Sequence, residues 1–296
     1  MKLKPFRLKD RVLFERYFRK LKCNLSGYVF ENIFIWRNSF NISWALINNN
    51  LCIFFKDSIG MFMPIPPLGK FNKKTISQVF EIMEEVNHNA DISRIENIEE
   101  SGLSFYRAAG LGFYEKGKEY LVSQDKVRSL KGDKFKHKRN LRNVFFRNNQ
   151  AIFRAYRLND KKQVLGLYVK WMQERSSCHD DVIYKAMLKD SFLAFTEMLE
   201  HFSAFKITAY VVEIEGKVFG FTSGFRLNKD TFCVNFEVVD LKIKGLSVFI
   251  FSELAGALQS YELINIMDDS GLESIRRAKQ LWHPNCLIPS YTGLKK

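Results

Sequence analysis

Short apolar runs separated by polar breaks organise the first half of the chain. The segment "RLKDRVLFERYFRKL" places apolar residues at helical spacing. The runs "ISWALI" and "LCIFF", separated by the turn signal "NNN", predict two strands. "ISQVFEIMEEV" returns to a helical period, and "GFYEKGKEYLV" predicts a hairpin that closes this half.

The second half repeats this alternation. "DKKQVLGLYVKWMQER" and "SFLAFTEMLEHF" predict two helices, and "ITAYVVEIEGKVFGFTSGFRL" predicts a hairpin with an "EG" turn. A strand "TFCVNFEVVD", a helix "SVFIFSELAGALQ", a strand "INIMDDSG" and a helix "LESIRRAKQLW" follow. We therefore expect an α+β protein of two similar domains, residues 1–125 and 126–296, each with a mixed, mostly antiparallel sheet flanked by helices.

Composition indicates a globular protein with an anionic partner. The 296 residues are 46% hydrophobic and 26% charged, and the net charge is +14. The charge is uneven, because residues 1–150 hold 27 Lys/Arg against 15 Asp/Glu, whereas residues 151–296 hold 19 against 17. Such asymmetry suits nucleic acid, a phosphate-rich cofactor or an anionic membrane surface.

The cysteines and the apolar runs bear on location. Five scattered cysteines lack metal-ligand or redox spacing, which favours a reducing compartment. The start "MKLKPFRLKD" has no apolar signal core, and no apolar run reaches the roughly 20 residues that span a bilayer. We expect a cytoplasmic protein without a transmembrane segment or a bound metal, whose basic surface could contact the inner face of an anionic membrane. The pattern does not indicate an oligomeric state.

The stretch "LKGDKFKHKRNLRNVF" gathers six Lys/Arg and one His between the two halves. Gly132 can end a short helix that begins near Ser123, and Asp133 can cap the next helix. Basic residues would then occupy the first turn of that helix, where cations oppose the helix dipole unless an anion is bound. The alternative is a solvated linker helix.

A second feature is the loop "DLKIKGLS" after a predicted strand. Lys242, Gly245 and Ser247 occupy the spacing at which acyl-CoA N-acyltransferases of the GNAT fold bind pyrophosphate with loop N–H groups. The structural alternative is a simple turn before a helix.

A third feature is a set of carboxylates at predicted strand ends. Glu237, Asp268 and Asp269 could activate an amine or hydroxyl nucleophile, or orient a cationic substrate group. The alternative for the two aspartates is surface ion pairing with Arg276 and Lys279 on the following helix.

Taken together, these segments resemble the family of the phosphatidylglycerol lysyltransferase C-terminal domain over nearly the whole chain. "GYVFENIFIWRNSF" and "FMPIPPLG" resemble the first domain of that family, and "LKGDKFKHKRN" resembles its central signature. The matching signature positions are Leu130, Gly132, Lys134, Phe135, Lys138, Arg139 and Asn140. "NFEVVD" and "INIMDDSGLESIRRAKQLWHP" resemble its last strand pair and closing helix.

The resemblance implies two tandem GNAT-like domains and transfer of an amino acid from aminoacyl-tRNA to a lipid head group, a peptide or a small molecule. It implies no tightly bound cofactor, with aminoacyl-tRNA or acyl-CoA as the co-substrate. We expect the donor phosphates along a basic set and the catalytic acid–base group at Glu237, with Asp269 and Asp268 close by. The basic substrate-binding set comprises Lys134, His137, Lys138, Arg139, Asn140 and Lys279. The chain departs from the family pattern at Asn235, Ile266 and Met267.

Two alternatives remain beside aminoacyl transfer. The loop at Lys242, Gly245 and Ser247 favours a CoA-dependent GNAT N-acyltransferase, and the basic first half suits tRNA. The other alternative is a non-catalytic protein that binds RNA or an anionic membrane on a GNAT scaffold.

Overall fold

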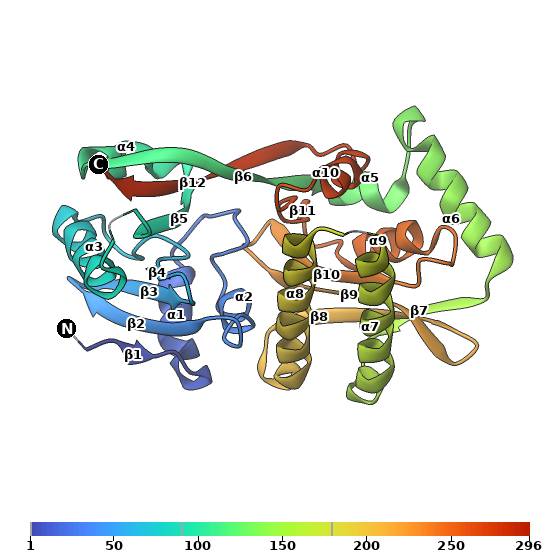
Figure 1. Cartoon of the computed structure of the whole chain (residues 1–296). Helices are drawn as coiled ribbons and strands as arrows, with labels where there is room; N and C mark the ends of the chain where they lie inside the picture. The colour runs from blue at the N-terminus through green and yellow to red at the C-terminus, as the bar shows by residue number, and fades with distance from the viewer. Residues whose placement is uncertain (1, 90, 179) are drawn as a thin grey trace. The chain divides into compact units, whose positions relative to one another are not determined.

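A computed structural model describes residues 2–89, 91–178 and 180–296, and the chain divides into two compact units. One unit is formed by Met1–Glu119 with Ile288–Lys296, and the other by Tyr120–Leu287 (Figure 1). The last nine residues therefore belong with the first unit. Whether residues 1–125 and 126–296 are independent domains stays a prediction.

The first unit contains a four-stranded antiparallel sheet in the order β1-β2-β3-β4 and an antiparallel pair of β5 with β12. The strands at "ISWALI" and "LCIFF" form as predicted, joined by Asn48 and Asn49 in left-handed conformations. The segment expected to be a hairpin, "GFYEKGKEYLV", instead lies within one long strand, β6. The elements are β1 (Lys4–Pro5), α1 (Arg11–Phe18), α2 (Phe30–Phe34), β2 (Asn41–Ile47), β3 (Asn50–Lys56), β4 (Met61–Phe62), α3 (Lys73–Asn87), β5 (Arg94–Glu99), α4 (Leu103–Ala108), β6 (Leu111–Ser123) and β12 (Cys286–Lys295).

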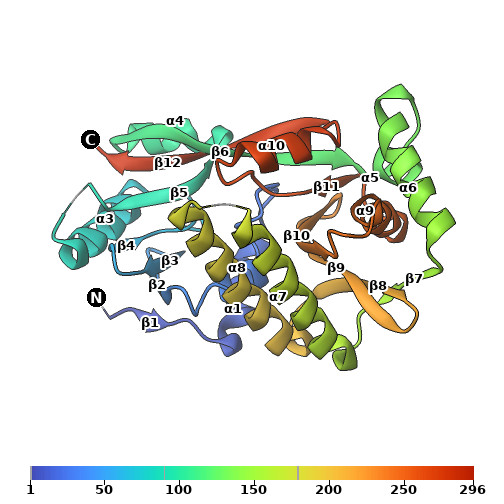
Figure 2. The ribbon, with the colours of Figure 1, turned by 45° about the vertical axis from the view of Figure 1, so that its right-hand side comes forward.

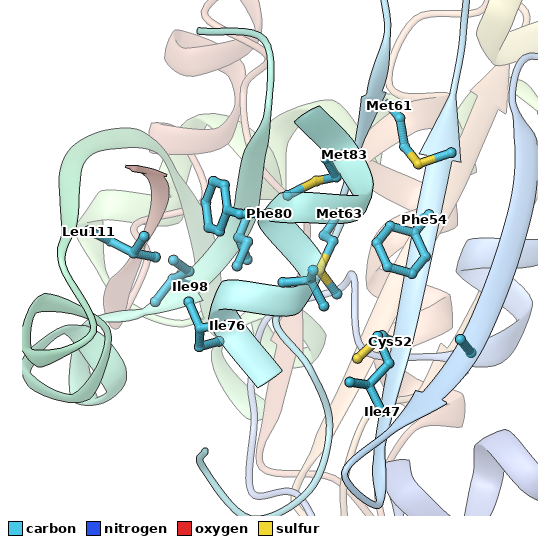
Figure 3. Close-up of a cluster of buried hydrophobic side chains, with 13 residues drawn as sticks. Ile47, Cys52, Phe54, Met61, Met63, Ile76, Phe80, Met83, Ile98 and Leu111 are labelled. Atoms are coloured by element: carbon cyan, nitrogen blue, oxygen red, sulfur yellow. The ribbon is translucent and has the colours of Figure 1, made fainter. Parts of the chain in front are cut away.

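The core of this unit lies between α3 and the strands. Figure 3 shows Phe80 and Met83 of α3 with Phe54 of β3, Ile98 of β5 and Met63, which directly follows β4; all are buried. The period of "ISQVFEIMEEV" explains this arrangement, because its apolar residues fall on one face of the helix.

In the second unit the end of β6 continues a sheet in the order β6-β11-β10-β9-β8-β7. The β8–β9 hairpin turns at Glu215 and Gly216, both with positive φ, as a two-residue turn between twisted strands requires. The elements are α5 (Gln124–Ser129), α6 (Lys136–Asn148), β7 (Ala151–Ala155), α7 (Lys161–Ser177), α8 (Val182–Glu200), β8 (Ile207–Ile214), β9 (Lys217–Arg226), β10 (Thr231–Val239), α9 (Leu246–Ala257), β11 (Leu263–Asn265) and α10 (Glu273–Gln280).

Helices cover the two faces of this sheet. The helices α7 and α8 run side by side along one face (Figures 1 and 2), where Phe195 of α8 packs edge-on against Phe221 of β9 and Phe236 of β10. The other face packs against the apolar helix α9, through residues that include Val212, Val239 and Ile250. No described helix has the length and apolar character needed to cross a membrane.

Candidate functional site

Strands β10 and β11 are neighbours over only a short length. They pair in parallel from Thr231 to Cys233 on β10, and β10 then continues to Val239. Glu237 lies in this continuing half of β10. The strand register places Glu237 opposite Thr222 and places Val239 opposite Gly220. Because Val239 packs against α9 and a Cβ on Gly220 would meet Ile250 of α9, Glu237 lies on the α9 side of the sheet.

Lys138 of α6 lies near Glu237 on that side. Its Nζ atom is 3.7 Å from the centroid of the Trp282 ring, and Trp282 packs edge-on against Phe251 of α9, 4.6 Å between centroids. Burial lowers the pKa of Lys138 to about 8, although the charge of Glu237 opposes this shift. Burial raises the pKa of Glu237 to about 8, although the charge of Lys138 opposes it.

Two groups with pKa values near 8 can give and take a proton close to neutral pH. Their titration belongs to the pair, because each charge acts on the other. A partly buried carboxyl and ammonium with this property suit general acid–base chemistry on an amine or hydroxyl. The structure thus brings together Lys138 and Glu237, which the sequence placed in different segments.

The turn before α6 differs from the prediction. The short helix α5 is capped by Ser123 as expected, but it ends at Leu130 in the left-handed conformation rather than at Gly132. Asp133 does not cap α6, because residues 133–135 form a separate turn of 3₁₀ helix and α6 starts at Lys136. Lys134 therefore lies outside the first turn of α6.

The remaining basic residues of this segment divide into two groups. Arg139 is turned toward the protein, where its Nη1 atom donates to the carbonyl oxygens of Leu130 and Gly132, each at 2.5 Å. It therefore closes the α5–α6 turn. Lys134, His137 and Asn140 have exposed side chains and could meet a ligand. Lys138, which also lies in the first turn of α6, is partly buried against Trp282.

Asp269 holds the loop after β11. Its carboxylate accepts from Tyr120 Oη at 2.5 Å, Arg276 Nε at 3.1 Å and Gly271 N at 3.0 Å. Burial alone would raise the pKa of Asp269, but the bonds from Tyr120 and Arg276 hold it below its usual value. These contacts favour the structural alternative for this residue.

Asp268 and Lys279 also serve this loop. Asp268 accepts from Ser270 N, and Lys279 Nζ donates to the carbonyl oxygens of Ile266 and Asp268. The geometry therefore assigns Lys279 to loop closure rather than to a phosphate contact.

The loop after β10 packs against α6. The Lys242 N–H donates to Asp240 Oδ1, and the Lys242 ammonium is exposed, 4.0 Å from Glu174. Gly245 has φ +85, and a Cβ atom there would lie 2.2 Å from the carbonyl oxygen of Leu141. Ser247 is exposed in the first turn of α9. Close packing of the loop on α6 thus accounts for Gly245 without a pyrophosphate.

Sequence reasoning missed three residues around this site. The sequence pattern gives Trp282 no role, places Tyr120 in a hairpin and does not single out Thr222. Only the register of β9 with β10 identifies Thr222 as the neighbour of Glu237. The Nε2 atom of His283 lies 3.1 Å from the carbonyl oxygen of Lys134.

The departures from the family pattern have structural roles. Asn235 accepts a hydrogen bond from Ser223 Oγ at 2.8 Å, at an irregularity in the β9–β10 pairing. The Ile266 N–H donates to the Tyr120 carbonyl, and Met267 adopts φ +61. Asn235 thus supports the β9–β10 pairing two residues from Glu237, and Ile266 and Met267 belong to the segment that follows β11.

Three solved structures show the fold. A conserved protein of unknown function from Bacteroides thetaiotaomicron superposes with a TM-score of 0.87 at 22% identity, covering 100% of both chains. L-PGS from Bacillus licheniformis superposes with a TM-score of 0.65 at 16% identity, covering 97% of this chain and 92% of that one. A tandem GNAT protein from the clavulanic acid biosynthesis pathway superposes with a TM-score of 0.54 at 10% identity, covering 100% of this chain and 98% of that one. The predicted fold class, α+β with tandem GNAT-like halves, is confirmed.

Family comparison agrees with the resemblance found in the sequence. No curated protein matches the chain. The model of the family "Phosphatidylglycerol lysyltransferase, C-terminal" matches residues 18–293. The chain belongs to this family.

Proposed function

We propose that this protein is an aminoacyltransferase that moves an amino acid from aminoacyl-tRNA to a nucleophilic acceptor. The observation that carries the proposal is the partly buried Lys138–Glu237 pair beside the exposed basic residues that precede and begin α6. Membership in a family described as a lysyltransferase supports the choice of reaction. A lipid head group, a peptide amine or a small molecule would supply the acceptor.

The reaction needs positioning and one proton transfer. An amine or hydroxyl of the acceptor attacks the ester carbonyl of the aminoacyl group, and the Glu237 carboxylate takes the proton that the nucleophile loses. Collapse of the tetrahedral intermediate breaks the ester bond. The ribose oxygen of the tRNA leaves and takes a proton from protonated Glu237 or from the Lys138 ammonium. The new amide or ester and free tRNA are the products.

The basic surface suits a polyanionic donor. The side chains of Lys134, Lys136 and His137, which are near one another in the sequence, are exposed to solvent. Arg147, farther along α6, is exposed too. Contacts with several phosphates give binding that weakens steeply as salt rises. The loop at Gly245 offers less support for CoA, because α6 packs directly on it and the N–H groups of Lys242 and Leu246 already donate to Asp240 and Ile243.

The test is incubation with a pool of tRNA charged with labelled amino acids and with fractionated cell extract. We expect label in one fraction, abolished by RNase, and reduced at least tenfold by Glu237→Gln or Lys138→Met. Lys189→Met is the control, because Lys189 lies on α8 with an exposed side chain, outside the basic segment that precedes and begins α6. Absence of RNase-sensitive transfer to every fraction would overturn the proposal.

Stabilisation of the protein by CoA, together with CoA-dependent acylation, would support the N-acyltransferase. Wild-type RNA binding by Glu237→Gln without any turnover in the parent would support a binding protein.

A further inference from the structure

Thr222 of β9 carries a buried hydroxyl without a use in the fold. The residue is 0% exposed, and its Oγ1 atom has no hydrogen-bond partner among the described residues. Burying such a group without a partner is destabilising, and most buried hydroxyls in proteins are bonded. The position therefore calls for an explanation.

The register of the sheet supplies a neighbour. Thr222 lies directly opposite Glu237 in the antiparallel pairing of β9 with β10. Side chains of opposite residues share one face of the sheet, with Cβ atoms typically about 4.5–5.5 Å apart. Here that face is the α9 side, on which Tyr210 of β8 flanks Thr222 from the next strand.

The groups around this pair leave both partners free. Lys138 of α6 is the charged group whose field acts on Glu237. On α9, burial raises the pKa of Glu253, and the charge of Arg142 on α6 opposes this shift. Within the described part of the chain, the Glu237 carboxyl has neither a hydrogen bond nor an ion pair within 4 Å. The Thr222 hydroxyl, which has no acceptor among the described residues, is thus opposite the Glu237 carboxyl, which has no donor there.

We propose that Thr222 is a positioning residue for Glu237, and that its hydroxyl donates a hydrogen bond to the ionised carboxylate. The two residues are opposite each other in the strand register, so such a bond would join the two side chains across the strand pair. The bond fixes the orientation of the carboxylate and favours its charged form. Only the catalytic role of Glu237 rests on the proposed function; the hydrogen bond does not.

The test follows the ionisation of Glu237 with a ¹⁹F probe at a neighbouring tryptophan. Trp282 lies against Lys138, so 5-fluorotryptophan at this position reports the charge of the pair by ¹⁹F NMR. Trp282→Phe identifies the resonance in the parent protein, and loss of a titration step in Glu237→Gln identifies the step of Glu237. We expect Thr222→Val to raise the midpoint of that step by about one pH unit, and Thr222→Ser to leave it in place.

Further variants separate the hydrogen bond from packing. Thr222→Ala should raise the midpoint as Thr222→Val does, and it replaces that variant if the valine does not fold. In the Glu237→Gln background, Thr222→Val should leave the remaining titration unchanged. An unchanged midpoint in both Thr222→Val and Thr222→Ala would overturn the proposal, and so would an equal shift in Thr222→Ser. The measurement uses neither donor nor acceptor, so failure of the transfer assay leaves its outcome intact.

Discussion

A Cβ atom on Gly245 would lie 2.2 Å from the carbonyl oxygen of Leu141, closer than real side chains approach backbone. Gly245→Ala should therefore lower the free energy of unfolding by about 2–3 kcal/mol, because alanine is strained at positive φ and displaces α6. Urea denaturation measures the change. Gly256 lies within α9, the helix that Gly245 precedes, and has open space around it, so Gly256→Ala should be stabilising by up to about 1 kcal/mol. Equal effects of the two variants would contradict the packing role of Gly245.

Glu237→Gln should change the pH dependence of stability. The pKa of Glu237 is about 8 in the folded protein against 4.5 for an unperturbed glutamate, so the native state keeps a proton that the unfolded chain loses. The stability that this proton contributes is full below pH 4.5 and is lost as pH rises through 8. The glutamine variant lacks that loss, and by pH 8 its free energy of unfolding should gain on the order of 4 kcal/mol relative to the parent.

Denaturation between pH 5 and 8 tests this prediction. Lys138, with a pKa of about 8 against 10.5, contributes mainly above this range. The exposed Glu215→Gln is the control and should stay within about 0.5 kcal/mol at each pH. A constant difference between Glu237→Gln and the parent across the range would show that Glu237 ionises normally.

Arg139→Gln should lower the stability of the protein more than it weakens ligand binding. Loss of the two hydrogen bonds to Leu130 and Gly132 should lower the free energy of unfolding by about 1–3 kcal/mol. The double variant of Lys134 and His137 to alanine should instead keep stability within about 0.5 kcal/mol and reduce the salt dependence of tRNA binding. The opposite pattern would mean that Arg139 is a ligand contact and that the two exposed residues are not.

Asp269→Asn should weaken the loop after β11. The pKa of Asp269 is held below 3.8, so its contribution to stability is present above pH 3.8 and is lost as pH falls through the folded pKa. At pH 7 we expect a loss of about 1–3 kcal/mol, shrinking below pH 4, as measured by thermal denaturation. Asp268→Asn is the neighbouring control, because among the described residues that carboxylate accepts hydrogen bonds only from Ser270. An equal loss in both variants would point to a general effect of charge.

The sequence predicted the elements far better than their contacts. The helical and strand periods located the pair β2–β3, the helix α3 and most of the second unit, because each period reports which face of an element is buried. β6 was misjudged since "EKGKE" resembles a turn, whereas the structure keeps it extended. Lys138 on α6 and Glu237 on β10 lie 99 positions apart in the sequence, and only the tertiary fold brings them together. Arg139 and Lys279 were expected to bind phosphate, since charge in a sequence does not reveal the carbonyl groups that its hydrogen bonds reach.

The return of residues 288–296 to the first unit has a consequence for synthesis on the ribosome. β12 pairs with β5 through Ser290, Tyr291, Gly293 and Leu294, so the sheet at β5 is completed only when this last strand emerges. All of Tyr120–Leu287 is translated before that moment. The second unit, with Lys138 and Glu237, can thus be made in full while the first unit still exposes the edge of β5 to the cell.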